Sequence, residues 1–181
     1  MYRSERVSDE HAIAIATHLL TADHELLAAA GSVASVRGEL ERAVASRSRH
    51  GPSYPPGESM IAALTSAQQQ AWAAHEELVA ADALLERPHP GGCVELPDPP
   101  TLGARLPADE RSRRWYPAPF DPIGMLLWHL RYRPWWSTLD VAARRLHGAR
   151  LALREREQQL DARCDAAVVR ARLPALGDVL G

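Results

Sequence analysis

The chain contains eight histidines, whose imidazole rings could bind a metal ion or transfer a proton. His11 and His18 lie seven residues apart and therefore share one face of a helix. A carboxylate-bridged metal site in a helical bundle uses Glu-x-x-His pairs that point inward. The one such spacing, Glu86-Arg87-Pro88-His89, contains a proline that ends a helix. We therefore predict surface or boundary histidines, no metal and no cofactor, and keep a helical-bundle metalloenzyme as the third functional hypothesis.

The sequence contains none of the short motifs of the common enzyme classes. It has no glycine-rich phosphate loop, dinucleotide fingerprint, nucleophile elbow or His-Glu-x-x-His. Its two cysteines, Cys93 and Cys164, do not form a Cys-x-x-Cys motif, and we interpret them as reduced thiols. No catalytic residue is assigned. The prediction leans away from an enzyme, although distant residues can still assemble a site.

The segment 111–136 concentrates side chains that commonly contact other molecules. It holds four of the five tryptophans, the only phenylalanine, two of the four tyrosines and five arginines. Trp, Tyr and Arg are the residues enriched in the hot spots of protein interfaces. The predicted binding residues of this aromatic-arginine segment are Arg111, Arg113, Arg114, Trp115, Tyr116, Trp128, Arg131, Tyr132, Arg133, Trp135 and Trp136.

Three interpretations of the aromatic-arginine segment remain open. The rings could close the end of a helical bundle whose Leu/Ala seams leave little volume to fill. They could instead dock a protein partner or a second copy of the chain, in which case we expect a homodimer. The third interpretation is contact with nucleic acid or an anionic membrane surface, because arginine pairs with phosphate and aromatic rings stack on bases.

Charge is distributed unevenly along the chain. The formal net charge of −2 combines −7 over residues 1–104, +6 over 105–156 and −1 over 157–181. All 21 basic residues are arginine, as a GC-rich genome would also produce. This asymmetry predicts either an internal electrostatic match or a surface for an anionic partner. The alternative function is therefore a nucleic-acid-binding protein that uses the basic 105–156 stretch.

The elements that position these residues are long amphipathic helices. After Ser8, a good N-cap, apolar residues recur every three or four positions along the first predicted helix, 8–49. A turn with three prolines and two glycines separates it from the second predicted helix, 58–87, and a loop this short places the two helices antiparallel. The seam residues of the first are Ala12, Ile15, Leu19, Ala22, Leu26, Ala29, Val33, Val36, Leu40 and Ala43. Those of the second are Met60, Leu64, Ala67, Ala71, Ala74, Leu78, Ala81 and Leu85.

A third helix is predicted over 137–173, with Ser137 as its N-cap. Its leucines repeat every seven residues, but the companion seam positions change from alanine to Arg156 and Arg163. The second half is therefore expected to be more polar and to project from the helical hairpin. The insertion arm, 88–136, is expected to be extended, with one short helix that begins after Asp121 and ends at Pro134.

These patterns predict an all-α fold: an elongated three-helix antiparallel coiled-coil-like bundle, formed by a single domain over 1–181. Sparse β-branched residues argue against a sheet, and no apolar run is long enough for a membrane span. The mixed-charge N-terminus is not a secretory signal, so we expect a cytoplasmic protein. The leading functional prediction is a non-enzymatic helical binding or assembly protein, a scaffold whose aromatic-arginine segment makes the protein contact.

Overall fold

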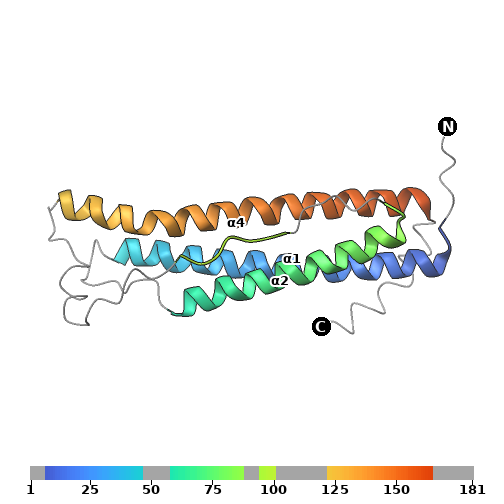
Figure 1. The fold of residues 1–181 in the computed structure, drawn as a ribbon, viewed down its shortest axis with the longest axis horizontal. Coiled ribbons are helices and arrows are strands. Elements are labelled where there is room, and N and C mark those ends of the chain that lie inside the picture. The colour runs from blue at the N-terminus through green and yellow to red at the C-terminus, as the bar shows by residue number, and fades with distance from the viewer. Residues whose placement is uncertain (1–6, 47–57, 88–93, 101–121, 165–181) are drawn as a thin grey trace. The chain divides into compact units, whose positions relative to one another are not determined.

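A computed structural model of the chain shows an all-α protein (Figure 1). The structure describes residues 7–46, 58–87, 94–100 and 122–164, with the backbone alone described at 43–46 and 122–132. These residues form the helices α1 (Asp9–Ser46), α2 (Glu58–Leu84) and α4 (Pro122–Arg163), and they contain no strand. The predicted helical bundle is confirmed. None of the described helices has a stretch apolar enough, over a sufficient length, to cross a membrane.

Helix α1 begins where the sequence predicts. The side-chain oxygen of Ser8 accepts a hydrogen bond from the backbone N–H of His11 at 3.4 Å, which is the arrangement of an N-cap. Asp9 and Glu10 follow in the first turn, where the positive end of the helix dipole stabilises a carboxylate.

The described helices form two compact units, and each helix contributes to both. Unit 1 takes the described residues of Met1–Ala29, Gln69–Glu95 and Arg145–Gly181, and unit 2 those of Ala30–Gln68 and Leu96–Arg144. The buried apolar residues of unit 1 are Ala12, Ile15, Ala16, Leu19, Ala22, Leu26, Ala29, Ala71, Ala74, Leu78, Ala81, Leu85, Leu146, Ala149, Leu153 and Leu160. Those of unit 2 are Val33, Val36, Leu40, Met60, Leu64, Ala67, Leu96, Trp135, Leu139 and Ala142.

The seams predicted for the first two helices form these cores. Every predicted seam residue of α1 and α2 whose side chain is described is buried, and Ala43 lies outside the described side chains. Because alanines are interspersed with larger residues along the seams, the helix backbones can approach closely. The hydrophobic periodicity therefore predicts the packing faces of α1 and α2 residue by residue.

The helices of unit 1 do not simply alternate in direction. The N–H of Val7 donates to the C=O of Arg163 at 3.2 Å, so α4 ends beside the start of α1 and runs antiparallel to it. Helix α2 is also antiparallel to α1, as the colours in Figure 1 show. Helices α2 and α4 are consequently parallel neighbours, which a tight turn cannot join.

The prediction that Pro134 separates a short helix from a third helix is wrong. Helix α4 is continuous from Pro122 to Arg163 with Pro134 inside it, and Ser137, the predicted N-cap, is an exposed residue within the helix. An internal proline removes one backbone hydrogen bond and costs about 3 kcal/mol. The pyrrolidine ring is exposed, whereas Trp135 directly after it and Leu139 one turn further along are buried, and their burial offsets this cost.

Helix α2 ends three residues before the predicted position, in a turn closed by its own backbone. The N–H of Glu86 donates to the C=O of Ala83 at 3.2 Å, and the N–H of Arg87 donates to the C=O of Asp82 at 3.0 Å. These two bonds form the Schellman motif of helix ends. Glu86 has a φ of 55°, in the left-handed region where this motif usually has glycine.

The substitution Glu86→Gly is expected to raise the free energy of unfolding by about 1 kcal/mol, because glycine has no Cβ that clashes in the left-handed region. Chemical denaturation followed by circular dichroism measures this change. The matched control is Glu76→Gly, an exposed site inside α2, which should lower the same quantity by about 1 kcal/mol. A lower free energy of unfolding for both variants would show that Glu86 does not adopt the left-handed conformation in solution.

Candidate functional site

The structure describes the side chains of three of the eleven predicted binding residues, namely Arg133, Trp135 and Trp136. Three others lie in the part of α4 whose backbone alone is described: Trp128, Arg131 and Tyr132. The remaining five lie outside the described residues: Arg111, Arg113, Arg114, Trp115 and Tyr116.

The three described residues differ in what they can contact. Trp135 is only 4% exposed and belongs to the core of unit 2, so its ring fills the bundle and is not accessible to a partner. Arg133 is exposed and Trp136 is half-buried. Trp135 thus fits the first interpretation of the aromatic-arginine segment, in which the rings fill the bundle. Arg133 and Trp136 remain candidates for a contact surface.

Trp136 packs against an arginine of α1 within unit 2. The guanidinium carbon of Arg37 lies 5.8 Å from the centroid of the Trp136 ring, and its Nη2 donates to Oδ1 of Asp140 at 2.5 Å. A cation–π contact at an exposed site contributes about 0.5–1 kcal/mol. Arg37 therefore bridges two residues of α4, Trp136 and Asp140.

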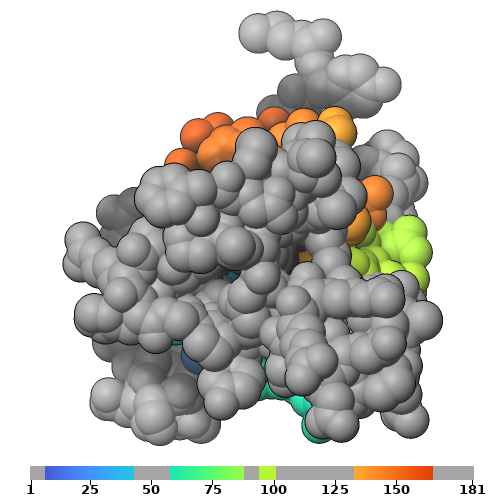
Figure 2. Space-filling view, turned by 90° about the vertical axis from the view of Figure 1, so that its left-hand side faces the viewer, coloured from blue at the N-terminus to red at the C-terminus, as the bar shows by residue number. Residues whose placement is uncertain are grey.

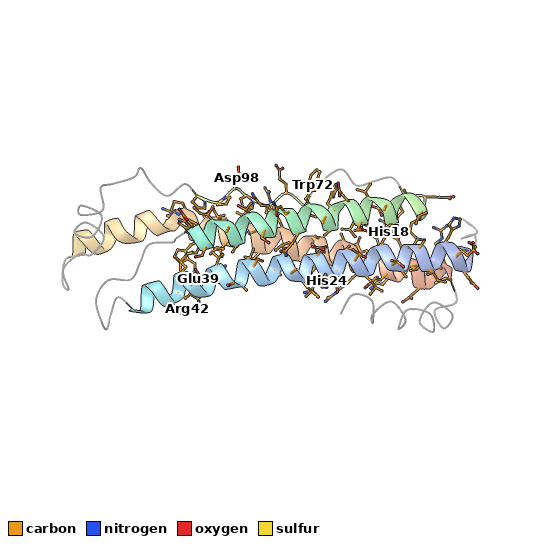
Figure 3. The ribbon with its side chains drawn as sticks, turned by 90° about the horizontal axis from the view of Figure 1, so that it is seen from below. His18, His24, Glu39, Arg42, Trp72 and Asp98 are labelled. Carbon is orange, nitrogen blue, oxygen red and sulfur yellow. The ribbon has the colours of Figure 1, made fainter. Side chains whose placement is uncertain are left out.

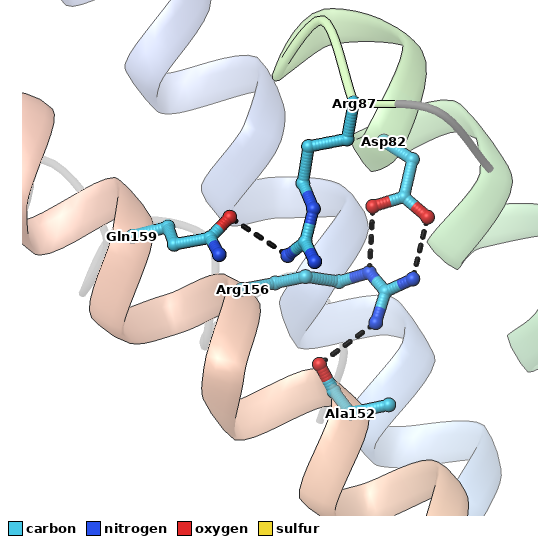
Figure 4. Close-up of polar contacts among 5 residues, drawn as sticks. All are labelled: Asp82, Arg87, Ala152, Arg156 and Gln159. Carbon is cyan, nitrogen blue, oxygen red and sulfur yellow. Dashed lines mark hydrogen bonds and ion pairs between the residues drawn. The ribbon is translucent and has the colours of Figure 1, made fainter. Parts of the chain in front are cut away.

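The most buried polar contact described is a salt bridge between α2 and α4 in unit 1 (Figure 4). Arg156 donates from Nε to Oδ1 of Asp82 at 2.8 Å and from Nη2 to Oδ2 at 2.5 Å. Its Nη1 donates to the C=O of Ala152 at 2.8 Å. The two side chains are 4% and 1% exposed, so a bidentate ion pair sits inside the helical core.

Two further contacts continue this interface toward the ends of α2 and α4. Nη1 of Arg87 donates to Oε1 of Gln159 at 2.7 Å (Figure 4), and Nη1 of Arg163 donates to the C=O of Leu85 at 2.9 Å. The prediction that the second half of α4 projects from the hairpin is therefore wrong through Arg163. The two seam arginines, Arg156 and Arg163, face α2 and bond to polar groups there. Residues 165 to 173 of the predicted helix lie outside the described residues.

The described histidines occupy different environments. Nδ1 of His18 lies 2.6 Å from Oε2 of Glu77, a hydrogen bond that joins α1 to α2. His75 is buried, with its ring centroid 5.7 Å from that of Trp72. His24 is exposed on the edge of α1 away from α2, whereas His18 lies between the two helices (Figure 3). Within the described part of the chain, no three His, Cys, Asp or Glu residues gather as metal ligands would.

Residues 94–100 run without regular secondary structure, as predicted for this part of the arm. In unit 2, Nε2 of Gln68 lies within hydrogen-bonding distance of the C=O of Pro97 (3.3 Å) and of Oδ1 of Asp98 (3.1 Å). Leu96 is buried, and the segment lies beside α4 in the end view (Figure 2). This segment therefore contacts both α2 and α4.

A cluster of like charges lies between α1 and α4 in unit 1. Partial desolvation raises the pKa of the Glu157 carboxyl above its ordinary value, and the carboxylates of Asp23 and Asp161 raise it further. The guanidinium of Arg154 acts in the opposite direction. Arg150 reaches the same place, with its Nε 3.6 Å from Oδ1 of Asp23.

Large apolar side chains are exposed on all three helices of unit 1. They are Leu20 and Leu27 of α1, Trp72 and Val79 of α2, and Leu151 of α4. Sequence reasoning did not single out these residues. Their signal was available, because each lies off the predicted core seam of its helix.

Among the described arginines of the basic stretch, Arg156 is buried, Arg150 is half-buried and Arg145 is exposed. Arg150 and Arg156 pair with acids of α1 and α2, and Arg145 donates to the C=O of Glu95. Arg144 and Arg154 are exposed. Part of the predicted charge asymmetry is therefore an internal electrostatic match, and part remains on the surface of α4.

The substitution Asp82→Ala is expected to lower the free energy of unfolding by about 3–5 kcal/mol, because it leaves the Arg156 guanidinium buried without its carboxylate. Chemical denaturation measures the loss. The control Asp140→Ala removes a surface pair and should cost about 1 kcal/mol or less. Equal losses would contradict the buried position of the Asp82–Arg156 pair, and the double change Asp82→Leu with Arg156→Met should restore most of the stability.

The substitution Glu157→Gln is expected to raise the melting temperature at neutral pH. The pKa of Glu157 is higher in the folded chain than its ordinary value of 4.5, so the ionised carboxylate destabilises the folded state. The stability that the protonated group provides is complete below that ordinary value and is lost as the pH rises through the folded pKa. Melting curves of Glu157→Gln should therefore converge with those of the wild type in acid, whereas the neighbouring control Glu155→Gln should show no such convergence.

Comparisons with protein-family models, with curated proteins and with solved structures found no match to this chain.

Proposed function

We propose that the chain is a non-enzymatic helical binding or assembly protein. The observation that carries this proposal is the exposure of five large apolar side chains on unit 1, combined with the use of its buried ionisable groups in helix packing. Singly scattered apolar residues are ordinary on protein surfaces, but Leu20 with Leu27 on α1 and Trp72 with Val79 on α2 lie seven residues apart and therefore share a helix face. Exposed apolar faces of this kind support contact with a partner.

The aromatic-arginine segment is retained as a proposed contact surface, without Trp135. Arg133 is exposed and Trp136 is half-buried beside Arg37, so a partner can reach both. Arginine and tryptophan side by side offer a planar donor and a large apolar surface, which suits a hot spot at a protein interface. Arg133 and Trp136 are thus the residues of this segment at which the proposal is most directly tested.

Nucleic-acid binding is the second candidate, and the exposed arginines of α4 favour it. Arg133, Arg144 and Arg154 are exposed and could neutralise phosphates. Arg150 and Arg156 instead pair with carboxylates of the bundle, so the number of available guanidinium groups is smaller than the sequence suggests. A membrane-spanning role is not part of either candidate.

Affinity capture from cells that produce the protein tests the first candidate against the second. Arg133→Glu with Trp136→Ala should reduce the captured partner about tenfold or more, because truncating a hot spot costs about 2 kcal/mol. Helix content measured by circular dichroism should not change.

The control Ser137→Ala alters an exposed residue of the same turn and should leave capture unchanged. Capture is compared before and after nuclease treatment and across a salt series. Complexes that disappear with nuclease and weaken steeply with salt would support nucleic-acid binding. An identical set of captured proteins for wild type and double variant would contradict the proposed contact surface.

A further inference from the structure

The outward face of α1 in unit 1 carries a second heptad pattern. Five residues follow one another at steps of four, three, four and three: Ile13, Thr17, Leu20, His24 and Leu27. Leu20 and Leu27 are 41% and 48% exposed, His24 is exposed, and the other two are half-buried. This α1 outer stripe is distinct from the buried seam, so α1 has one apolar seam inside the unit and another at its surface.

The α1 outer stripe is unusually free of charge. From Ala12 to Val36 the helix contains only two charged residues, Asp23 and Glu25, and both are half-buried. The solvent face of a bundle helix is ordinarily charged, as the exposed Arg154 and Glu155 of α4 are. The face of α1 thus resembles a surface that is covered by protein.

The hydroxyl groups on this face are already satisfied. Oγ1 of Thr17 donates to the C=O of Ile13 at 2.8 Å, and Oγ1 of Thr21 donates to the C=O of Thr17 at 3.1 Å. Because each donor is bonded to its own helix, covering these threonines leaves no hydroxyl hydrogen without an acceptor. His24 is the exposed polar side chain of the stripe, and it points away from α2 (Figure 3).

We propose that the α1 outer stripe binds a second copy of the chain, with the two α1 helices antiparallel and the two-fold axis beside His24. This inference rests on the proposed binding and assembly function and names its partner. In this arrangement Leu20 of one copy lies against Leu27 of the other. The two His24 side chains lie beside the axis, whereas Asp23 lies on the flank of α1 that faces Arg150 of α4.

A second copy suits this face better than it suits the other exposed apolar residues. A two-fold interface places each surface patch against itself, so charged patches meet like charges. On α2, Glu76 lies between the exposed Trp72 and Val79, and two copies would bring these carboxylates together. On α4, Leu151 follows Arg150 and precedes the exposed Arg154. The α1 outer stripe has His24 where the α2 pattern has Glu76, and the neighbouring Asp23 already pairs with Arg150 of α4.

The size of the face predicts the strength of the dimer. The stripe is about 21 Å long, and an α-helix is about 10 Å wide. Such a footprint is smaller than the roughly 800 Å² per partner of a standard stable interface. The dimer should therefore be in exchange with monomer, and its population should rise with protein concentration.

Sedimentation velocity on the full chain across a concentration series tests the proposal. The wild type should shift from monomer toward dimer as concentration rises, and Leu20→Glu with Leu27→Glu should remain monomeric with unchanged helix content. The matched control is Leu151→Glu, which changes a leucine of the same exposure class on the charged face of α4 and should dimerise like the wild type. A wild type that stays monomeric at its highest attainable concentration overturns the proposal, as does a double variant that dimerises.

Disulfide cross-linking tests the orientation in a background with Cys93→Ser and Cys164→Ser. His24→Cys lies beside the proposed axis and should form a covalent dimer on mild oxidation, whereas Ile13→Cys should not, because an antiparallel pair places the two Ile13 positions far apart. Equal cross-linking at both positions would overturn the antiparallel arrangement.

The outcomes separate this inference from the proposed function. Loss of dimer with retained partner capture, in Leu20→Glu with Leu27→Glu, supports the second copy at α1 and an independent contact at Arg133 and Trp136. A monomeric wild type that still captures its protein partner would contradict the dimer and leave the binding function standing. A wild type that dimerises through α1 while capture is insensitive to Arg133→Glu with Trp136→Ala would contradict only the aromatic-arginine surface.

Discussion

The arrangement of α2 against α4 depends on burying Asp82 and Arg156 together. Each ion alone would cost several kcal/mol to remove from water, and the bidentate geometry compensates only when the two side chains meet. The Leu/Ala seams on either side are repetitive, and a shift by one heptad would still bury leucine against alanine. Such a shift would separate the two charges. The seams therefore provide the apolar burial, while the ion pair selects the register.

This pair also explains part of the uneven charge along the chain. Asp23 and Asp82 come from the acidic residues 1–104, and they meet Arg150 and Arg156 of the basic stretch. The charges of the acidic residues 1–104 and of the basic stretch partly neutralise one another because α4 packs on α1 and α2 within unit 1. The surface charge of α4 is correspondingly smaller than its composition suggests, and an anionic partner would depend on exposed arginines such as Arg144.

Periodicity predicted the core because one physical rule decides it: apolar residues on one helix face are buried together. Two other features required tertiary information. A local rule ends a helix at Pro134, but burial of Trp135 overrides it. Arg156 at a seam position looks like a loss of packing until Asp82, 74 positions away, supplies its carboxylate. In the aromatic-arginine segment, Trp135 is buried and the adjacent Trp136 is half-buried, a difference that composition cannot assign because the segment has no clear period.

Exposure of an apolar side chain does not by itself mark a contact surface, and α1 and α4 show why its neighbours matter. Leu151 and Leu27 are almost equally exposed, at 47% and 48%. Around Leu151 the guanidinium groups of α4 keep the surface hydrated, and covering it would require their desolvation. On the face of α1 that holds Leu20 and Leu27, Thr17 and Thr21 bond to their own backbone, so covering that face displaces water from largely apolar atoms. The helix whose inner seam builds the core is thus also the helix whose outer face loses least hydration on association.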